Sequence, residues 1–201
     1  MTFIICIVLR LRGGSYPQYI LDKAAELNDD NERDENKFFP LYDKILNYWF
    51  PPTEDYDVCP QWYIPGHKNW VDYSITYVVE HRQCPLLLVE VKPPSDFRSD
   101  TKRMIASNQV IGRLHEVDPV RPNVQDTNKL YSISAIGKRW RAWYISVDDG
   151  VQPVQGIAGV TSLKVHKSDC WNPDITSDDS WVALRGIVDK IKDQVTSAQS
   201  W

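Results

Sequence analysis

The chain has 201 residues, of which 42% are hydrophobic and 25% are charged, and its formal net charge is −4 at pH 7. These values predict one globular domain with a sizeable core, and no run of about 18 apolar residues indicates a transmembrane helix. An acidic balance argues against non-specific binding of nucleic acid, but much of the acidity lies in the segment 28–36, and the remainder is close to neutral.

The four cysteines and four histidines do not group into any spacing typical of a metal site or a disulfide framework. Unpaired cysteines are typical of a reducing compartment. We therefore expect an intracellular protein of the nucleus or cytoplasm, with no membrane partner.

The first fourteen residues are expected to form a separate segment. Residues 2–9 are apolar, but Arg10 and Arg12 follow them, whereas a signal peptide carries its positive charges first. Residues 7–14, Ile-Val-Leu-Arg-Leu-Arg-Gly-Gly, resemble the C-terminal tail of ubiquitin. The resemblance implies a fusion remnant that a deubiquitinating enzyme would cut after Gly14. The alternative is a short edge strand that ends in two glycines by chance.

Two helices and a loop are predicted next. Residues 17–27 favour a helix with proline in its first turn. Residues 38–50 favour a second helix, which Pro51 ends because proline lacks the backbone donor. Residues 51–69 are rich in proline, aspartate and glycine and predict a long loop.

Two strand-length apolar runs, residues 70–79 and 85–92, are separated by a short polar turn and predict an antiparallel hairpin. Side chains alternate along a strand, so Glu90 and Lys92 share a face. The hairpin would place Asp72 opposite residue 90, 91 or 92. If Asp72 lies opposite residue 90 or 92, the side chains of Asp72, Glu90 and Lys92 all project from one face of the hairpin. A shift of one residue in the pairing would move the Asp72 side chain to the other face.

Two acids and a lysine on neighbouring strands can hold a divalent metal ion and cleave a phosphodiester. Mg²⁺ or Mn²⁺ would bind the carboxylates of Asp72 and Glu90, because hard cations prefer oxygen ligands. The metal would activate a bound water, and Lys92 would orient that water or stabilise the developing charge. The competing interpretation is a solvent-exposed ion pair across the hairpin.

A third helix, capped by Ser99 or Asp100, is predicted to follow. Its apolar stripe consists of Ala106, Val110, Leu114 and Val117. Another face carries Lys102 and Arg113, which could contact nucleic-acid phosphates or simply be solvated. Gln109 is either a site residue or an exposed helix residue.

A second hairpin is predicted from residues 130–136 and 139–145, joined by a two-residue turn at Gly137. Trp140 is expected in the core, with the arginines at 139 and 141 outside. A short strand near residues 154–160 would follow.

The C-terminal region favours a helix capped by Asp178 or Asp179. Its buried stripe would consist of Leu184, Ile187, Val188, Ile191 and Val195. The order of all elements predicts an α/β fold, with one mixed sheet flanked by helices.

An acid on one strand followed by Glu90-Val91-Lys92 on the next resembles the signature of the PD-(D/E)XK nuclease superfamily. The resemblance covers residues 38–145 and implies a restriction-endonuclease-like α-β-β-β-α-β core within one nuclease-like domain, residues 15–201. It further implies a Mg²⁺-dependent nuclease acting on DNA or RNA. Gln109 matches a glutamine that many members carry on the helix after the lysine strand. More loosely, the chain looks like fungal nuclease-like domains and Crinkler-type effectors.

The sequence departs from the family pattern in places. Val71 stands where a proline usually precedes the first acid, and a further acid from an early helix could be Glu26 or Asp43. The alternative function is an inactive nuclease-fold module that binds protein or nucleic acid in an effector-like role. A degenerate site, in which Lys92 pairs away from its expected partners, would favour that alternative.

Overall fold

The structure is a computed structural model that describes residues 14–27, 32–63, 74–121, 129–154 and 167–198. Two features singled out in the sequence, Asp72 and the greater part of the ubiquitin-tail-like segment, lie outside these ranges.

A mixed sheet forms the centre of the described chain, with its six strands arranged in chain order. The strands are β1 (Tyr56–Tyr63), β2 (Ser74–His81), β3 (Cys84–Lys92), β4 (Leu130–Ile136), β5 (Arg139–Ser146) and β6 (Gly150–Pro153). Strands β3 and β4 are parallel, and the other neighbouring pairs are antiparallel. A parallel pair needs a crossover connection, which here contains a helix.

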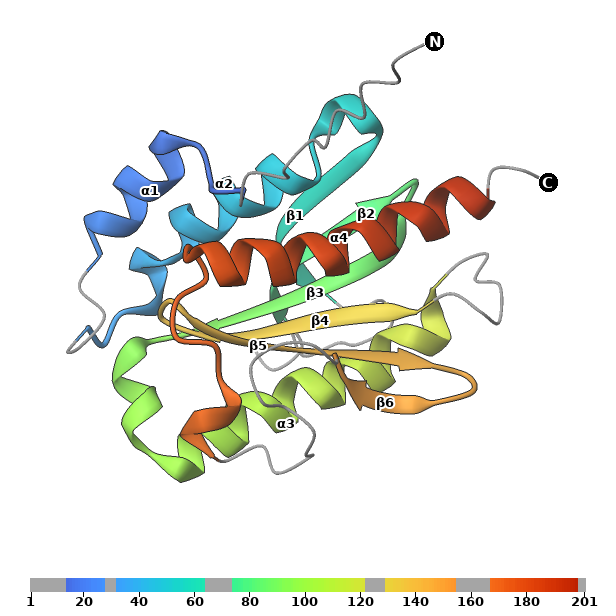
Figure 1. The fold of residues 1–201 in the computed structure, drawn as a ribbon. Coiled ribbons are helices and arrows are strands. Elements are labelled where there is room, and N and C mark those ends of the chain that lie inside the picture. Colours follow the sequence, from blue (N-terminus) through green and yellow to red (C-terminus); the bar gives the residue numbers. More distant parts are fainter. Residues whose placement is uncertain (1–13, 28–31, 64–73, 122–128, 155–166, 199–201) are drawn as a thin grey trace, which may run out of the picture.

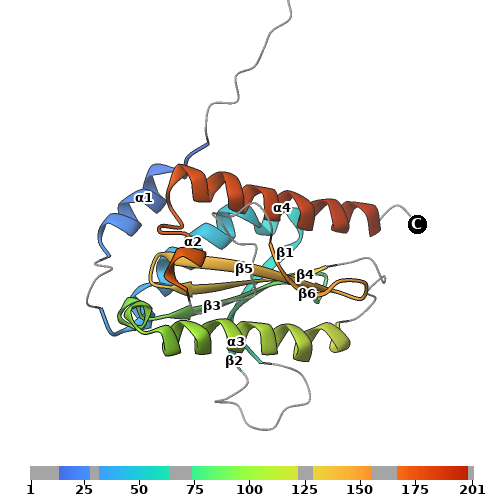
Figure 2. The same cartoon turned by 60° about the horizontal axis from the view of Figure 1, so that its bottom comes forward.

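Helices cover both faces of this sheet (Figures 1 and 2). The helices α1 (Gln18–Ala25), α2 (Phe39–Trp49) and α4 (Asp178–Ala198) lie on one face, and α3 (Asp100–Val117) lies on the other. The order α2, β1, β2, β3, α3, β4 is the predicted α-β-β-β-α-β arrangement. The predicted fold class, a mixed sheet flanked by helices, is therefore confirmed.

The larger hydrophobic core lies between the sheet and α1, α2 and α4. Alternate residues of β3, such as Val89 and Val91, pack there with Ile45 of α2 and Ile187 of α4. On the other face, Leu88 joins a smaller cluster that includes Val110 and Leu114 of α3. The alternation of β3 therefore separates the two layers, and it places Glu90 and Lys92 on the α3 side.

The loop predicted for residues 51–69 is wrong at residues 56–63, which form β1. This strand contains Pro60 and Gln61, and Gln61 has a φ of +50°. Such residues are typical of loops, but an edge strand tolerates them because one side of it needs no hydrogen-bond partner. Pairing with β2 therefore decides the conformation of this segment.

The first hairpin forms as predicted, but in a different register. Its turn consists of Arg82 and Gln83, with φ of +51° and +64°, so both strands extend into residues expected to be turn. A register shift at Val79 adds to this change. Tyr77 pairs with Val89, and Thr76 therefore lies beside Glu90.

The remaining elements agree largely with expectation. Ser99 caps α3, accepting a hydrogen bond from the backbone N–H of Lys102 at 3.4 Å, and the second hairpin is confirmed. Ser177, not an aspartate, caps α4, since its Oγ accepts from the Ser180 N–H at 3.2 Å. Strand β6 ends before the residues predicted to form it, and residues 155–166 lie outside the described ranges.

The described chain begins at Gly14, which packs against the indole of Trp181 on α4. A Cβ at this position would lie 2.0 Å from the ring, so a larger residue would force a shift. Tyr16 is buried next to Trp49, whose Nε1 donates to its hydroxyl at 3.2 Å. None of the described helices combines the length and apolar character that a bilayer span requires.

Candidate active site

Glu90 and Lys92 project from one face of β3 at its C-terminal end. The Lys92 Nζ lies 3.9 Å from the Glu90 Oε2. Glu90 is buried, with 3% of its surface exposed, whereas Lys92 is partly accessible. The strand places the carboxylate inside the protein and the ammonium at its surface.

Two further side chains, from β2 and α3, approach the Glu90 carboxylate. Thr76 on β2 donates its hydroxyl to Oε2 at 3.3 Å, and the Thr76 Oγ1 also accepts from the Val91 N–H at 3.2 Å. Arg113 on α3 has its Nε 4.0 Å from Oε1. Oε1 itself receives no hydrogen bond from any residue in the described ranges. The carboxylate is thus held at one oxygen and available at the other.

Burial raises the pKa of Glu90 to about 7. Lys92, Arg113 and the Thr76 hydroxyl favour the charged form and limit this rise in the pKa, and Glu35 adds to it. A buried acid with such a pKa is common at functional sites, although structural ion pairs produce it as well.

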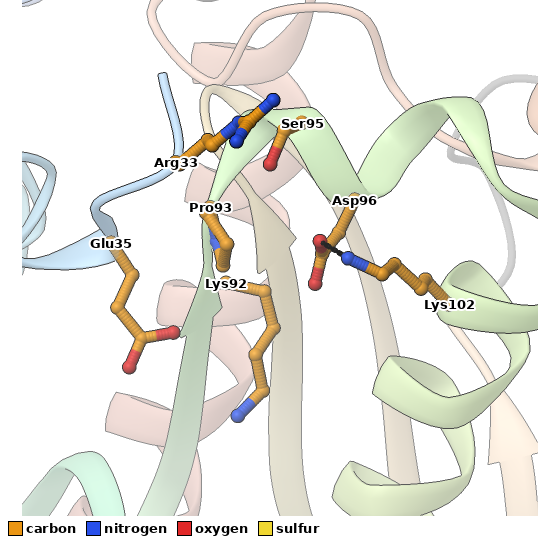
Figure 3. Close-up of a pocket in the computed structure, with 7 residues that line it drawn as sticks. All are labelled: Arg33, Glu35, Lys92, Pro93, Ser95, Asp96 and Lys102. Atoms are coloured by element: carbon orange, nitrogen blue, oxygen red, sulfur yellow. Dashed lines mark hydrogen bonds and ion pairs between the residues drawn. The ribbon is translucent and has the colours of Figure 1, made fainter. Parts of the chain in front are cut away.

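A pocket of about 590 Å³ opens beside Lys92 (Figure 3). It is lined by Arg33, Glu35, Lys92, Pro93, Ser95, Asp96 and Lys102. Figure 3 shows Lys92 and Glu35 extending to the same side of the pocket, and Lys102 paired with Asp96 on the far wall.

Two short helices enclose the pocket: η1 (Glu35–Lys37) and η3 (Pro94–Arg98). The Ser95 N–H donates to the Glu32 carbonyl at 3.2 Å and joins the segment before η1 to η3. The pocket therefore combines three cations and two acids from segments that are distant in the sequence.

The structure separates the residues predicted to contact nucleic acid. Lys102 is exposed and lines the pocket. Arg113 is buried, with 7% of its surface exposed, and its Nη1 lies 2.8 Å from Glu116 as well as near Glu90. This position does not suit contact with a phosphate on the surface. Gln109 is half-buried on α3, one turn before Arg113.

Residues absent from the predicted site also lie close to it. Glu35 acts electrostatically on Glu90. Of the two acids proposed from an early helix, Glu26 pairs with Lys23 and Asp43 is exposed on α2. Glu35 belongs to the acidic segment 28–36, and no periodicity in the sequence identified it.

Thr76 lies within the apolar run 70–79 that the sequence singles out, but its position beside Glu90 follows from the observed register of the hairpin.

The donor set can be tested for a metal. Carboxylate oxygens suit Mg²⁺, and Glu90 Oε1 is a buried oxygen without a donor among the described residues. Glu90 therefore fits a metal ligand. Within the same ranges, no group of three or more histidine, cysteine, aspartate or glutamate side chains could hold an ion. A complete site would need the second predicted ligand, Asp72, which lies outside them.

No protein-family model matches the sequence, and no curated protein matches it either. Among solved structures, the chain is similar to the type IIG restriction endonuclease BpuSI, with a TM-score of 0.49 and 17% sequence identity. The similarity covers 85% of this chain and 18% of that one, so this chain spans less than a fifth of that enzyme's length. The restriction-endonuclease-like character of the fold rests on the order and pairing of its own elements.

Proposed function

We propose that this chain is a Mg²⁺- or Mn²⁺-dependent nuclease that hydrolyses phosphodiester bonds of DNA or RNA. The observation that supports this most strongly is the pairing of Glu90 with Lys92 at the end of β3, beside a charged pocket. The pair lies in an α-β-β-β-α-β arrangement of elements.

In this proposal Glu90 and Asp72 hold the metal ion. When bound, the ion supplies an activated water and neutralises charge on the phosphate. Asp72 stays a predicted ligand, which the described residues do not include. Thr76 holds the Glu90 carboxylate in place through Oε2.

Lys92 acts on the substrate directly. Its ammonium is partly accessible and lines the pocket, so it donates hydrogen bonds to a phosphate oxygen and stabilises the charge that develops there. Arg33 and Lys102 line the same pocket and hold neighbouring phosphates of the strand. Gln109 remains a proposed site residue from its place on α3.

A specific observation also favours the second candidate function, an inactive nuclease-fold module that binds protein or nucleic acid. Glu90 is buried between two cations, Lys92 at 3.9 Å and Arg113 at 4.0 Å. Because two side-chain cations already balance the charge of this carboxylate, binding of a metal ion to it is less favourable. An effector-like role, as in Crinkler-type proteins, belongs to this alternative.

A cleavage assay distinguishes the two. The full chain is incubated with plasmid, single-stranded DNA and RNA in Mg²⁺, in Mn²⁺ and in chelator. We expect metal-dependent cleavage that falls about 100-fold or more in Asp72→Ala, Glu90→Gln and Lys92→Ala. Lys192→Ala, on the opposite face of the molecule, is the matched control and should cleave normally. If the folded wild type cuts nothing, or the three variants cut as it does, the binding module becomes the better account.

Cleavage after Gly14 by a deubiquitinating enzyme stays a prediction. The packing of Gly14 against Trp181 and the burial of Tyr16 oppose it, because a protease needs an extended, accessible segment. Mass spectrometry after incubation with such an enzyme would show whether the chain then starts at Ser15.

A further inference from the structure

The face of the sheet beneath α3 contains a layer of buried polar side chains. Strand β4 contributes Ser132 and Ser134 to this face, although a central parallel strand usually buries valine, isoleucine or leucine. Strand β5 contributes Arg141, and α3 contributes Ser107. None of these four side chains is more than 1% exposed. The prediction that Arg141 lies outside is therefore wrong, because α3 covers that face.

The strand register connects this layer to the proposed site. Glu90 pairs with Ser134, and Ser134 pairs with Arg141 on the next strand. Register partners on neighbouring strands lie about 5 Å apart and point to the same face. Ser134 is thus the immediate neighbour of Glu90 on β4.

The serine hydroxyls of this layer lack hydrogen-bond partners among the described residues. The hydroxyls of Ser107, Ser132 and Ser134, like Glu90 Oε1, form no hydrogen bond with any part of the chain that the structure describes. Leaving such a group unsatisfied costs about 1–3 kcal/mol. Buried polar groups in proteins are normally satisfied, by ordered water where no side chain reaches them.

We propose that an ordered water is bound between Ser134 Oγ and Glu90 Oε1, which makes Ser134 a positioning residue for Glu90. The inference rests on the proposed function, since Glu90 is the ligand that it positions. Thr76 already occupies Oε2, and the Nε of Arg113 at 4.0 Å is too far for a direct hydrogen bond. A hydroxyl both donates and accepts, so Ser134 suits a bridging water.

The water fixes the direction of the Glu90 carboxylate. With Oε2 held by Thr76 and one lone pair of Oε1 by the water, the carboxylate has one orientation relative to Lys92, and the second lone pair of Oε1 is left for a metal ion. Side chains that orient a metal ligand in this indirect way typically contribute about 10–100-fold to metal affinity or activity. Ser132 offers a matched comparison, because it is an equally buried serine on the same face of β4 but pairs with Leu88.

The test measures Mg²⁺ binding to the full chain by calorimetry, and the Mg²⁺ concentration for half-maximal cleavage. Ser134→Ala should weaken both by about 10–100-fold, whereas Ser132→Ala should leave both unchanged. Ser134→Thr keeps the hydroxyl and should recover most of the loss. Melting temperatures of all variants confirm folding. Equal Mg²⁺ binding in wild type, Ser134→Ala and Ser132→Ala would overturn the positioning role.

A crystal structure of the full chain tests the water independently of activity. Density for a water within hydrogen-bonding distance of Ser134 Oγ and Glu90 Oε1 supports the assignment, and well-defined side chains without it refute the assignment. If the wild type neither binds Mg²⁺ nor cleaves, the proposed function and the role of Ser134 in it both fail. The crystallographic result still decides the water site in that case.

Discussion

The two faces of β4 differ in chemistry although they belong to the same strand. Tyr131, Ile133 and Ala135 pack in the larger core beneath α2 and α4. Ser132 and Ser134, on the alternate positions, lie in the polar layer beneath α3. Both sets are buried, so exposure to solvent does not explain the difference.

The comparison shows that one layer stabilises the fold and the other accommodates charge. Apolar burial is the main favourable term in folding, whereas buried hydroxyls and charges contribute little net stability. Apolar residues at the same positions would make the fold more stable. Buried polar residues that are kept despite this cost occur mostly at functional sites. The proposed site lies at the end of this polar layer.

The largest expected effect compares neighbouring residues on the two faces of β4. Ile133→Ala should lower the free energy of unfolding by about 2–5 kcal/mol, because it leaves a cavity in the larger core. Ser134→Ala should change it by about 1 kcal/mol or less, because it removes a hydroxyl that forms no bond within the described residues. Urea unfolding measures both. Similar losses in the two variants would show that the faces do not differ in stability.

The second effect is the pH dependence that Glu90 brings to the polar face. Its folded pKa of about 7 exceeds the ordinary value of 4.5, so the folded chain holds the proton through this window and the unfolded chain releases it. The free energy of unfolding therefore falls as the pH rises from 4.5 to 7.

Glu90→Gln should remove this dependence, because glutamine has the same shape and does not titrate. The wild type should lose roughly 3 kcal/mol more than the variant between about pH 4.5 and pH 8. Urea unfolding at both pH values gives the difference between the two proteins. If the free energy of unfolding changes equally with pH in the two proteins, the pKa of Glu90 lies near its ordinary value and burial has little effect on it.

A third comparison uses glycines on the two sides. Gly14→Ala should destabilise the chain by about 1–3 kcal/mol, since its Cβ would enter the ring of Trp181. Gly112→Ala on α3 should stabilise it by about 0.5–1 kcal/mol, because nothing lies within 4 Å and alanine favours a helix. Thermal unfolding distinguishes the signs. A stable Gly14→Ala variant would indicate that the segment separates from α4.

The smallest effect concerns the outer surface of the apolar layer. Lys192 on α4 lies 2.6 Å from Glu54 of η2 (Pro52–Glu54). An exposed ion pair of this kind contributes about 0–1 kcal/mol and weakens with salt. Lys192→Ala should therefore reduce stability slightly at low salt and hardly at all at high salt. A larger loss would mean that this pair, rather than the core, holds α4 to the domain.

Local periodicity in the sequence determined much of the fold. The runs 70–79 and 85–92 predicted one hairpin and residues 130–145 a second, and the stripe along residues 106–117 predicted the buried side of α3. Alternation also placed Glu90 and Lys92 on one face, and the structure agrees. These features depend only on residues close together in the chain, so a pattern can reveal them.

Tertiary structure decided what depends on distant contacts. Pairing with β2 made a strand from loop-like residues, and a two-residue turn set the register that brought Thr76 to Glu90. The approach of η1 and α3 brought Glu35 and Arg113 toward the same carboxylate. No local pattern encodes these approaches, because register and packing depend on the geometry of the whole sheet and its covering helices.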